Sequence, residues 1–252
     1  MHNTLEFADL LRLIDERSAA FCAAVAAAPG LGAPVPTCPG WTLFDLVQHL
    51  GAGRRAWAAT IAAGPADAKA VPAGAPPAPR ELPALLDWMA DSTRALLDAL
   101  REYGPDRECW TWWSTSQSPR TSGAAARHQL PEIAVHTYDA QVTAGNPQAL
   151  PTEVALDGVE DFLFTCCATT SPWPHEPAVV DYHTTEGPSW RLWLSAAGAR
   201  AARLAADAPP DASARGSAHE LITVLYGRNP VDSLELEGDV RVFDRLVAWE
   251  PE

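Results

Sequence analysis

RHQLPEIAVHTYDA, residues 127–140, is the stretch that decides how the first part of the chain is expected to fold. It sets Glu132 and His136 four positions apart in a segment that is otherwise apolar enough to pack into a core. Residues i and i+4 lie one above the other on a helix, so these two side chains point the same way and can share one target. A metal ion is one such target.

The first part of the chain has the pattern of four helices separated by turn-rich loops. The first three are expected at 4–28, 42–63 and 80–104, and the fourth contains the stretch 127–140. In these segments apolar residues recur with the period of a helix that packs one face into a core. Thr42 and Asp45 form a capping-box pattern where the second helix begins. The sequence therefore predicts a four-helix bundle.

The second of these helices carries His49 at the border of its apolar face. The face itself is formed by Leu43, Leu46, Val47 and Leu50. Two helices of a bundle can thus present His49, Glu132 and His136 to a single point, as metal sites in bundle cores do. Two imidazoles and a carboxylate suit zinc, and three protein ligands leave one coordination position open, which is typical of a catalytic site.

The same residues also have a simpler explanation. A glutamate and a histidine four apart occur by chance in many helices, and a histidine in a core is usually hydrogen-bonded and inert. His128, four positions before Glu132, is a substitute ligand if one of the three fails. Cys38, in the stretch TCPGW, is the thiol nearest this site, and both buried packing and metal binding are open for it.

The pattern of apolar residues changes after residue 150, where short segments with the pattern of strands alternate with helical segments. Helices are expected at 152–170, 218–227 and 239–249, strands at 178–186, 189–196, 199–206 and 233–239, and a loop at 207–216. Gly187 and Pro188 mark a hairpin turn, and Ser217 and Glu220 form a second capping box. We expect a helical domain at 1–150 and, at 151–252, a small α+β domain with a short mixed or antiparallel sheet.

Composition limits the functions that the chain can have. Its 252 residues are 47% hydrophobic, which supports a real core, and its net charge of −14 repels nucleic acid and anionic lipid surfaces. No apolar run approaches the roughly 20 residues that span a bilayer, and the N-terminus lacks the pattern of a signal peptide. We therefore expect a cytoplasmic protein without nucleic-acid or membrane partners. Five cysteines without a CxxC pair indicate reduced thiols.

Three stretches carry a resemblance to a known family. They are VPTCPGWTLFDLVQHLG at 35–51, EIAVHTYDA at 132–140, and LYGRNP at 225–230 followed by LELEGD at 234–239. Together they resemble the mycothiol-dependent maleylpyruvate isomerase family, nearly over the whole chain and in the same order. The resemblance implies a DinB-like four-helix bundle followed by an α+β domain. It also implies that His49, Glu132 and His136 bind a divalent metal, usually zinc, and that Arg228 holds a carboxylate of the substrate.

The resemblance further implies mycothiol as a thiol cosubstrate. Its metal-bound thiolate would attack an electrophilic small molecule, an unsaturated or aromatic acid, and the enzyme would be an isomerase or an S-transferase acting as a monomer or homodimer. Two other functions stay open. One is a metal enzyme that activates water or a carbonyl without a thiol. The other is a non-catalytic binding protein, in which Trp110, Trp112 and Trp113 line a ligand pocket rather than plug the end of the bundle.

Two residues fit less simply. Pro131 stands where many relatives have a histidine, and a proline there predicts either a kink or the start of the fourth helix. Arg228 has an explanation that needs no substrate, because a positive charge at the end of a helix is favoured by the helix dipole.

Overall fold

The computed structural model describes residues 5–72, 74, 76–205 and 209–250, and it divides them into two compact units. The helical unit consists of residues 5–112 and 119–150. The C-terminal unit consists of residues 113–118 and the described chain from Pro151 onward. Thr4 and Ala206, predicted ends of the first helix and third strand, lie outside the described residues, as do residues 207 and 208 of the predicted loop.

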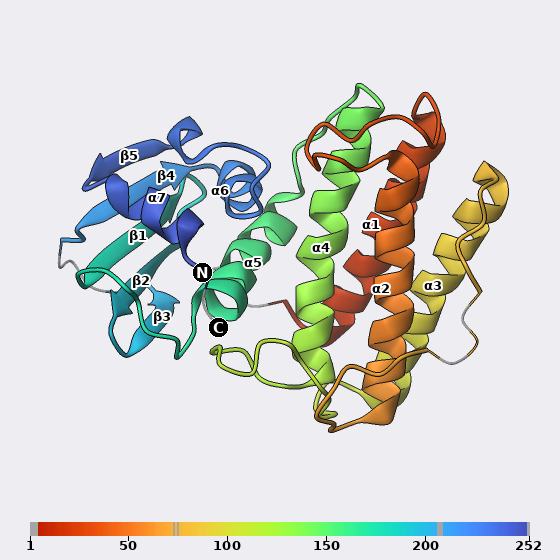
Figure 1. Cartoon of the computed structure of the whole chain (residues 1–252), viewed down its shortest axis with the longest axis horizontal. Helices are drawn as coiled ribbons and strands as arrows, with labels where there is room; N and C mark the ends of the chain where they lie inside the picture. The colour runs from red at the N-terminus through yellow and green to blue at the C-terminus, as the bar shows by residue number, and fades with distance from the viewer. Residues whose placement is uncertain (1–4, 73, 75, 206–208, 251–252) are drawn as a thin grey trace. The chain divides into compact units, whose positions relative to one another are not determined.

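The helical unit is built from four long helices (Figure 1): α1 Phe7–Ala27, α2 Leu43–Ala63, α3 Leu82–Tyr103 and α4 Ser122–Thr143. Within it α1 packs chiefly on α4, and α2 packs chiefly on α3. All four helices contribute fully buried side chains to the core, among them Ile14, Phe21, Leu46, Val47, Met89, Leu96, Leu130 and Ile133. The predicted helical N-terminal part is confirmed.

The start of α2 is defined by its capping box, as the sequence predicts. Thr42 is the N-cap, its hydroxyl accepts from the Asp45 N–H, and the Asp45 carboxylate accepts from the Thr42 N–H at 2.9 Å. Each interaction satisfies an amide that the first helical turn leaves without a partner. Asp45 thus caps the helix. Because the capping box fixes where α2 begins, it also fixes the side of the helix on which His49 lies.

Pro131 lies inside α4 rather than at its beginning. The helix starts after the N-cap Thr121, whose hydroxyl accepts from the Ala124 N–H, and Figure 1 shows α4 as one continuous helix. Of the two predicted outcomes, a helix start at Pro131 is therefore wrong. Proline cannot donate the usual bond to the carbonyl of Arg127, and α4 nevertheless continues across that gap. Pro131 itself is buried.

The C-terminal unit contains a five-stranded mixed sheet in the order β3-β2-β1-β4-β5. Its strands are β1 Ala178–Thr184, β2 Ser189–Ser195, β3 Gly198–Arg203, β4 Ala212–Gly216 and β5 Glu235–Gly238. Neighbouring strands are antiparallel except for β1 and β4, which are parallel. Helices α5 Thr152–Phe162, α6 Ala218–Leu225 and α7 Arg241–Ala248 complete the unit, with a π-helical turn Leu163–Cys167 and a 3-10 turn Val231–Ser233. The predicted small α+β part is confirmed.

Two predictions in this unit are wrong in detail. β4 lies in a stretch that the sequence predicts as a loop. The prediction missed this strand because its small residues have low strand propensity. Pairing with β1 and burial of Ala212 and Ala214 make it a strand. The helix expected at 152–170 ends at Phe162 and continues as the π-helical turn.

The segment 113–118 belongs to the C-terminal unit although it lies between α3 and α4 in the chain. The Gln117 side chain donates to the Ala201 carbonyl at 3.0 Å and accepts from its N–H at 2.6 Å, so it pairs with the edge strand β3. The Gln117 N–H also donates to the Phe164 carbonyl. Trp113 is buried at the start of this segment.

None of the helices that the structure describes is both long and apolar enough to span a membrane.

Candidate metal centre

Helices α2 and α4 bring His49, Glu132 and His136 to one place. Glu132 Oε1 lies 3.0 Å from His49 Nε2 and 3.4 Å from His136 Nε2. One donor atom from each residue lies within 4.8 Å of the other two, as a shared metal ion requires. The positions i and i+4 on α4 align Glu132 with His136, while α2 supplies the third side chain from the other helix.

A tight turn before α2 places an aromatic ring beside the two imidazoles. The Trp41 N–H donates to the Cys38 carbonyl at 3.0 Å, and Gly40 takes a φ of 85°, which glycine adopts without strain. The Trp41 ring lies 5.0 Å from the His49 ring and is stacked on the His136 ring at 6.3 Å. Trp41 therefore forms an apolar wall of the site.

Exposure falls steadily across the three side chains. It is 45% for His49, 24% for Glu132 and 8% for His136. A cation held here would be reached from the His49 side, whereas the His136 side is closed by protein. This suits a site that must admit a small molecule.

His136 is oriented by a buried carboxylate that the sequence reasoning did not single out. Its Nδ1 lies 2.8 Å from Asp139 Oδ2, and the Asp139 side chain is fully buried. The Cys38 thiol donates to the same carboxylate oxygen at 3.4 Å. A carboxylate on one ring nitrogen of histidine fixes the proton there and leaves the other nitrogen to bind a metal. The i, i+3 spacing of His136 and Asp139 was the available signal.

Burial and hydrogen bonding pull the pKa values of this cluster in opposite directions. Burial alone lowers the pKa of His136, but the hydrogen bonds to Asp139, Cys38 and Glu132 outweigh it and hold that pKa well above its ordinary value. Burial alone raises the pKa of Glu132, but the hydrogen bonds to His136 and His49 outweigh it and hold that pKa well below its ordinary value. Without a cation, the hydrogen bonds therefore favour the carboxylate form of Glu132 and the protonated form of His136.

The donor set fits a zinc-like cation. Ligand atoms about 2.0–2.1 Å from a tetrahedral ion lie roughly 3.3 Å from one another, and the two distances to Glu132 Oε1 agree with this spacing. A second group, Cys38, His136 and Asp139, also has donor atoms within 4.8 Å of one another. The first group is the better candidate because Asp139 is fully buried and already hydrogen-bonded to His136 Nδ1, whereas the side chain of His49 is 45% exposed and that of Glu132 is 24% exposed.

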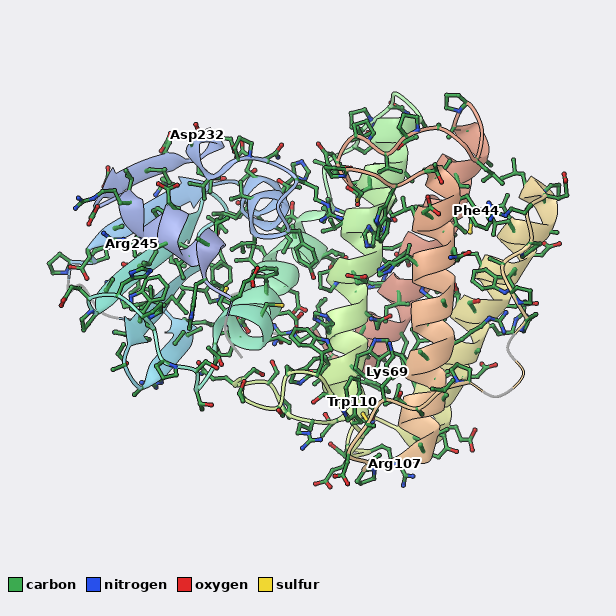
Figure 2. The ribbon with its side chains drawn as sticks, viewed as in Figure 1. Phe44, Lys69, Arg107, Trp110, Asp232 and Arg245 are labelled. Carbon is green, nitrogen blue, oxygen red and sulfur yellow. The ribbon has the colours of Figure 1, made fainter. Side chains whose placement is uncertain are left out.

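The other histidine and the tryptophans considered from the sequence do not gather at this site. His128 packs edge-on against Trp112 at 5.5 Å and belongs to neither metal-capable group that the described residues form. Trp110 packs on Trp57, and Figure 2 shows it with Arg107 at the end of the bundle. Trp113 is buried in the C-terminal unit.

Arg228 lies in the C-terminal unit, just after α6. Its backbone N–H donates to the Thr223 carbonyl at 2.7 Å, and its guanidinium donates to the Tyr226 carbonyl at 2.6 Å. The side chain is half-buried. Bonds to the last carbonyls of a helix are what the explanation without a substrate predicts.

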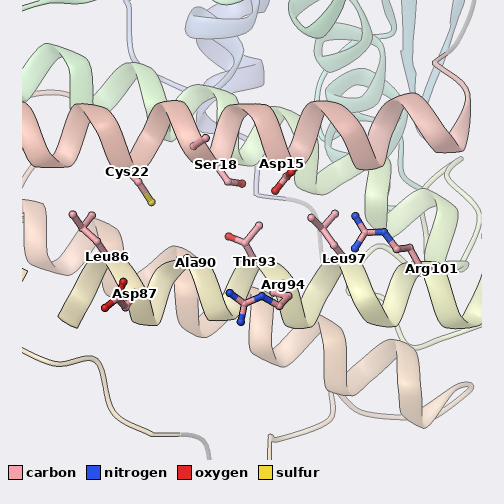
Figure 3. Close-up of a pocket in the computed structure, with 11 residues that line it drawn as sticks. Asp15, Ser18, Cys22, Leu86, Asp87, Ala90, Thr93, Arg94, Leu97 and Arg101 are labelled. Atoms are coloured by element: carbon pink, nitrogen blue, oxygen red, sulfur yellow. The ribbon is translucent and has the colours of Figure 1, made fainter. Parts of the chain in front are cut away.

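The groove between α1 and α3 is a different feature (Figure 3). Its volume is about 450 Å³, and it is lined by charged groups of both signs, including Asp15, Asp87, Arg94 and Arg101. None of the three residues proposed as metal ligands is among the described residues that line it. The groove is therefore a separate feature from the candidate metal centre.

Comparison with known proteins identifies both parts of the chain. Residues 11–141 match the model of the mycothiol maleylpyruvate isomerase N-terminal domain, and residues 153–245 match that of the C-terminal domain of the same family. The comparison with curated protein sequences gave no match.

Two solved structures share the fold over almost their whole length. One is the crystal structure of the mycothiol-dependent maleylpyruvate isomerase, with 15% identity and a TM-score of 0.61, and the other is a histidine-to-alanine mutant of that enzyme, with 14% identity and a TM-score of 0.63. Each similarity covers 94% of this chain and 95% of the solved chain. At this identity the structures support the fold, and the family follows from the two domain matches. The chain belongs to the mycothiol maleylpyruvate isomerase family, a family of enzymes.

Proposed function

We propose that this chain is a metal-dependent, thiol-using isomerase or S-transferase, with mycothiol as its thiol and an unsaturated small-molecule acid as its substrate. The observation that carries the proposal is the convergence of His49, Glu132 and His136 on one point, with one side open. Family membership supports the thiol and the class of substrate.

The three side chains have complementary duties in this proposal. His49 and His136 offer neutral imidazole nitrogens, and Glu132 offers one negative charge, so a divalent ion keeps a net positive charge. When bound, such a cation supplies the means to deprotonate a coordinated thiol at neutral pH. Asp139 holds the His136 ring so that Nε2, rather than Nδ1, faces the cation.

The isomerisation of the substrate needs no net transfer of protons. The thiolate sulfur forms a bond to one carbon of a conjugated double bond, and the electron pair moves onto the neighbouring carbonyl oxygen. Rotation about the resulting single bond follows. The pair then returns, the carbon–sulfur bond breaks, and the thiolate leaves unchanged. In an S-transferase the carbon–sulfur bond would be retained, and the carbon next to the carbonyl would take up one proton, so that the thiol as a whole adds across the double bond.

Arg228 is proposed to bind the carboxylate of the substrate. Its planar guanidinium suits a carboxylate, which it can hold with two parallel hydrogen bonds. The residue matches the arginine of the family motif, and this resemblance supports the assignment.

The deciding experiment measures bound metal and thiol dependence in the same preparations. We expect about one divalent ion per chain in the wild type by elemental analysis, and turnover of maleylpyruvate only when mycothiol is added. His49→Ala and His136→Ala should lose the metal and the activity while keeping their helical circular dichroism. His175→Ala, at an exposed loop position, is the matched control and should keep both.

The alternatives give different results in this experiment. Turnover of a substrate without any thiol would indicate a metal enzyme that activates water or a carbonyl. Absence of a stoichiometric metal, together with tight binding of a small acid, would indicate a binding protein. Wild-type metal content in both histidine variants would refute the site assignment.

A further inference from the structure

The C-terminal unit contains a partly open cavity, and none of the residues proposed as metal ligands is among the described residues that line it. Its volume is about 310 Å³, and it lies among the end of α5, the π-helical turn, β1, α6 and α7. Side chains that face it include Phe162, Val224, Leu246 and Trp249. Volumes of about 300–1,000 Å³ are usual for small-molecule sites. The cavity is therefore large enough to be a site.

The base of the cavity is formed by two buried rings that pack on each other. Tyr182 on β1 and Phe243 on α7 pack edge-on with their ring centres 6.1 Å apart, and both are almost fully buried. Phe243 and Val242 are the buried residues of α7, which anchor this short helix beside the cavity. Rings fixed in this way form a preformed surface, so a ligand would not have to order them.

One wall is made by the π-helical turn Leu163–Cys167. This turn brings two consecutive cysteines, Cys166 and Cys167, to the cavity. Burial raises the pKa of the Cys167 thiol to about 12, so this thiol stays uncharged at neutral pH. An uncharged thiol behaves as a small apolar group. π-helical turns are rare and are frequent at functional sites.

The lining is mainly apolar and carries no charge. Among the described residues that line the cavity there is no acidic or basic side chain, whereas the chain as a whole carries a net charge of −14. Phe162, Val224, Leu246 and Trp249 are only half-buried, so part of their apolar surface is left for water to contact. An apolar ligand would remove that surface from water, which is favourable.

We propose that this cavity binds an uncharged, mainly aromatic small molecule of about the size of two or three rings. A cavity of roughly 150 Å³ takes one benzene molecule, so a cavity of twice that volume takes a correspondingly larger one. A small carboxylic acid does not suit these walls, because burying an unpaired charge is costly. The ligand is thus chemically distinct from the acid proposed as the substrate, and the inference does not depend on the proposed function.

Two fluorescent probes with the same ring system test the chemical class on the full-length chain. N-phenyl-1-naphthylamine is uncharged, and 1-anilinonaphthalene-8-sulfonate is its sulfonated counterpart. We expect the uncharged probe to bind with a dissociation constant lower by about tenfold or more. Equal or tighter binding of the sulfonated probe would overturn the proposal.

A substitution that fills the cavity tests the location. Val231 lines the cavity and is half-buried at the 3-10 turn, so Val231→Trp should occupy the space and weaken binding of the uncharged probe by about tenfold or more. Val71→Trp makes the same change at a residue that is 86% exposed and belongs to the helical unit. It should leave binding unchanged. Unchanged binding in Val231→Trp would overturn the location.

Thiol protection gives a readout on the wild-type protein, so the test does not depend on how a variant folds. Cys166 and Cys38 are both half-buried, but only Cys166 lines the cavity. Saturating uncharged probe should slow alkylation of Cys166 by N-ethylmaleimide, measured by mass spectrometry, and should leave the rate at Cys38 unchanged. Equal rates at Cys166 with and without the probe would contradict the assignment.

Discussion

At the scale of single residues, the candidate metal centre depends on which nitrogen of His136 carries a proton. The Asp139 carboxylate lies 2.8 Å from Nδ1 and is fully buried, so it selects the tautomer that leaves Nε2 facing Glu132. Cys38 donates a further hydrogen bond to the same carboxylate. The site is thus supported by a polar network rather than by three ligands alone.

Removing the charge of Asp139 tests this support. Asp139→Asn keeps the size of the side chain, but its amide no longer selects one tautomer of His136, so we expect metal affinity to fall by about 10–100-fold. The measurement is a competition titration of zinc against a chelator. Asp98→Asn, an exposed carboxylate on α3 that pairs with Arg101, serves as the control and should not change the affinity. Full affinity in Asp139→Asn would show that the network is not needed.

The raised pKa of His136 predicts a release of protons on metal binding. In the cation-free protein the hydrogen bonds to His136 raise its pKa and so favour its protonated form, and a metal ion that binds Nε2 must displace that proton. The affinity for the metal should therefore rise with pH, up to the pH at which His136 is already deprotonated in the metal-free protein. Calorimetric titration of zinc at neutral pH in two buffers of different ionisation enthalpy measures the release. Identical heats in both buffers would contradict the prediction.

At the scale of the elements, α2 is positioned by its capping box and by close packing on α3. Gly51, two residues after His49, lies against the ring of Trp88, where an added Cβ would come within 2.0 Å of a ring atom. Glycine is therefore needed here for the close approach of two helices, since its backbone conformation is an ordinary helical one. The position of His49 depends on this contact.

Substituting the two glycines of α2 separates packing from helix propensity. Gly51→Ala should lower the free energy of unfolding by about 1–3 kcal/mol, because Trp88 has to move. Gly53→Ala, where an added Cβ meets nothing within 4 Å, should instead raise it by about 0.5–1 kcal/mol. Urea denaturation followed by circular dichroism compares the two. If Gly51→Ala and the wild type have the same free energy of unfolding, the Trp88 ring moves aside without loss of stability, and the prediction is wrong.

The elements also show where sequence reasoning succeeds and fails. The period of apolar residues predicted the four long helices and the hairpin of β1 and β2, because these patterns are local. It failed at β4, whose small residues have weak strand propensity and form a strand only through parallel pairing with β1. It also could not show that α4 continues through Pro131, because packing against neighbouring helices decides that.

At the scale of the whole molecule, two separate stretches of the described residues belong to the C-terminal unit. The first is the short segment 113–118, which precedes α4 in the sequence. Within it, the side-chain oxygen and nitrogen of Gln117 both hydrogen-bond to the backbone of the edge strand β3. A sheet edge with unpaired backbone groups favours association with other strands, so this side chain also protects the edge. No local pattern in the sequence indicates such an excursion.

Gln117 is expected to contribute to the stability of the C-terminal unit. Gln117→Ala removes both hydrogen bonds to Ala201 and should lower the free energy of unfolding of this unit by about 1–3 kcal/mol. Gln148→Ala, at an exposed position in the helical unit, is the control and should have little effect. Hydrogen exchange at β3 measures the local change. Equal protection of β3 in Gln117→Ala and the wild type would contradict this role.

The sequence by itself determined the two-part architecture, both capping boxes and the alignment of Glu132 with His136, because each follows from the spacing of residues along a single element. The match of motifs in order also indicated the family. Only the tertiary structure decided that His49 reaches Glu132, that Asp139 and Cys38 stand behind His136, and that an uncharged cavity lies beside α7. Some of these contacts join side chains that are far apart in the sequence, and others depend on the direction in which side chains point. The periodicity of a single helix or strand predicts neither kind of contact.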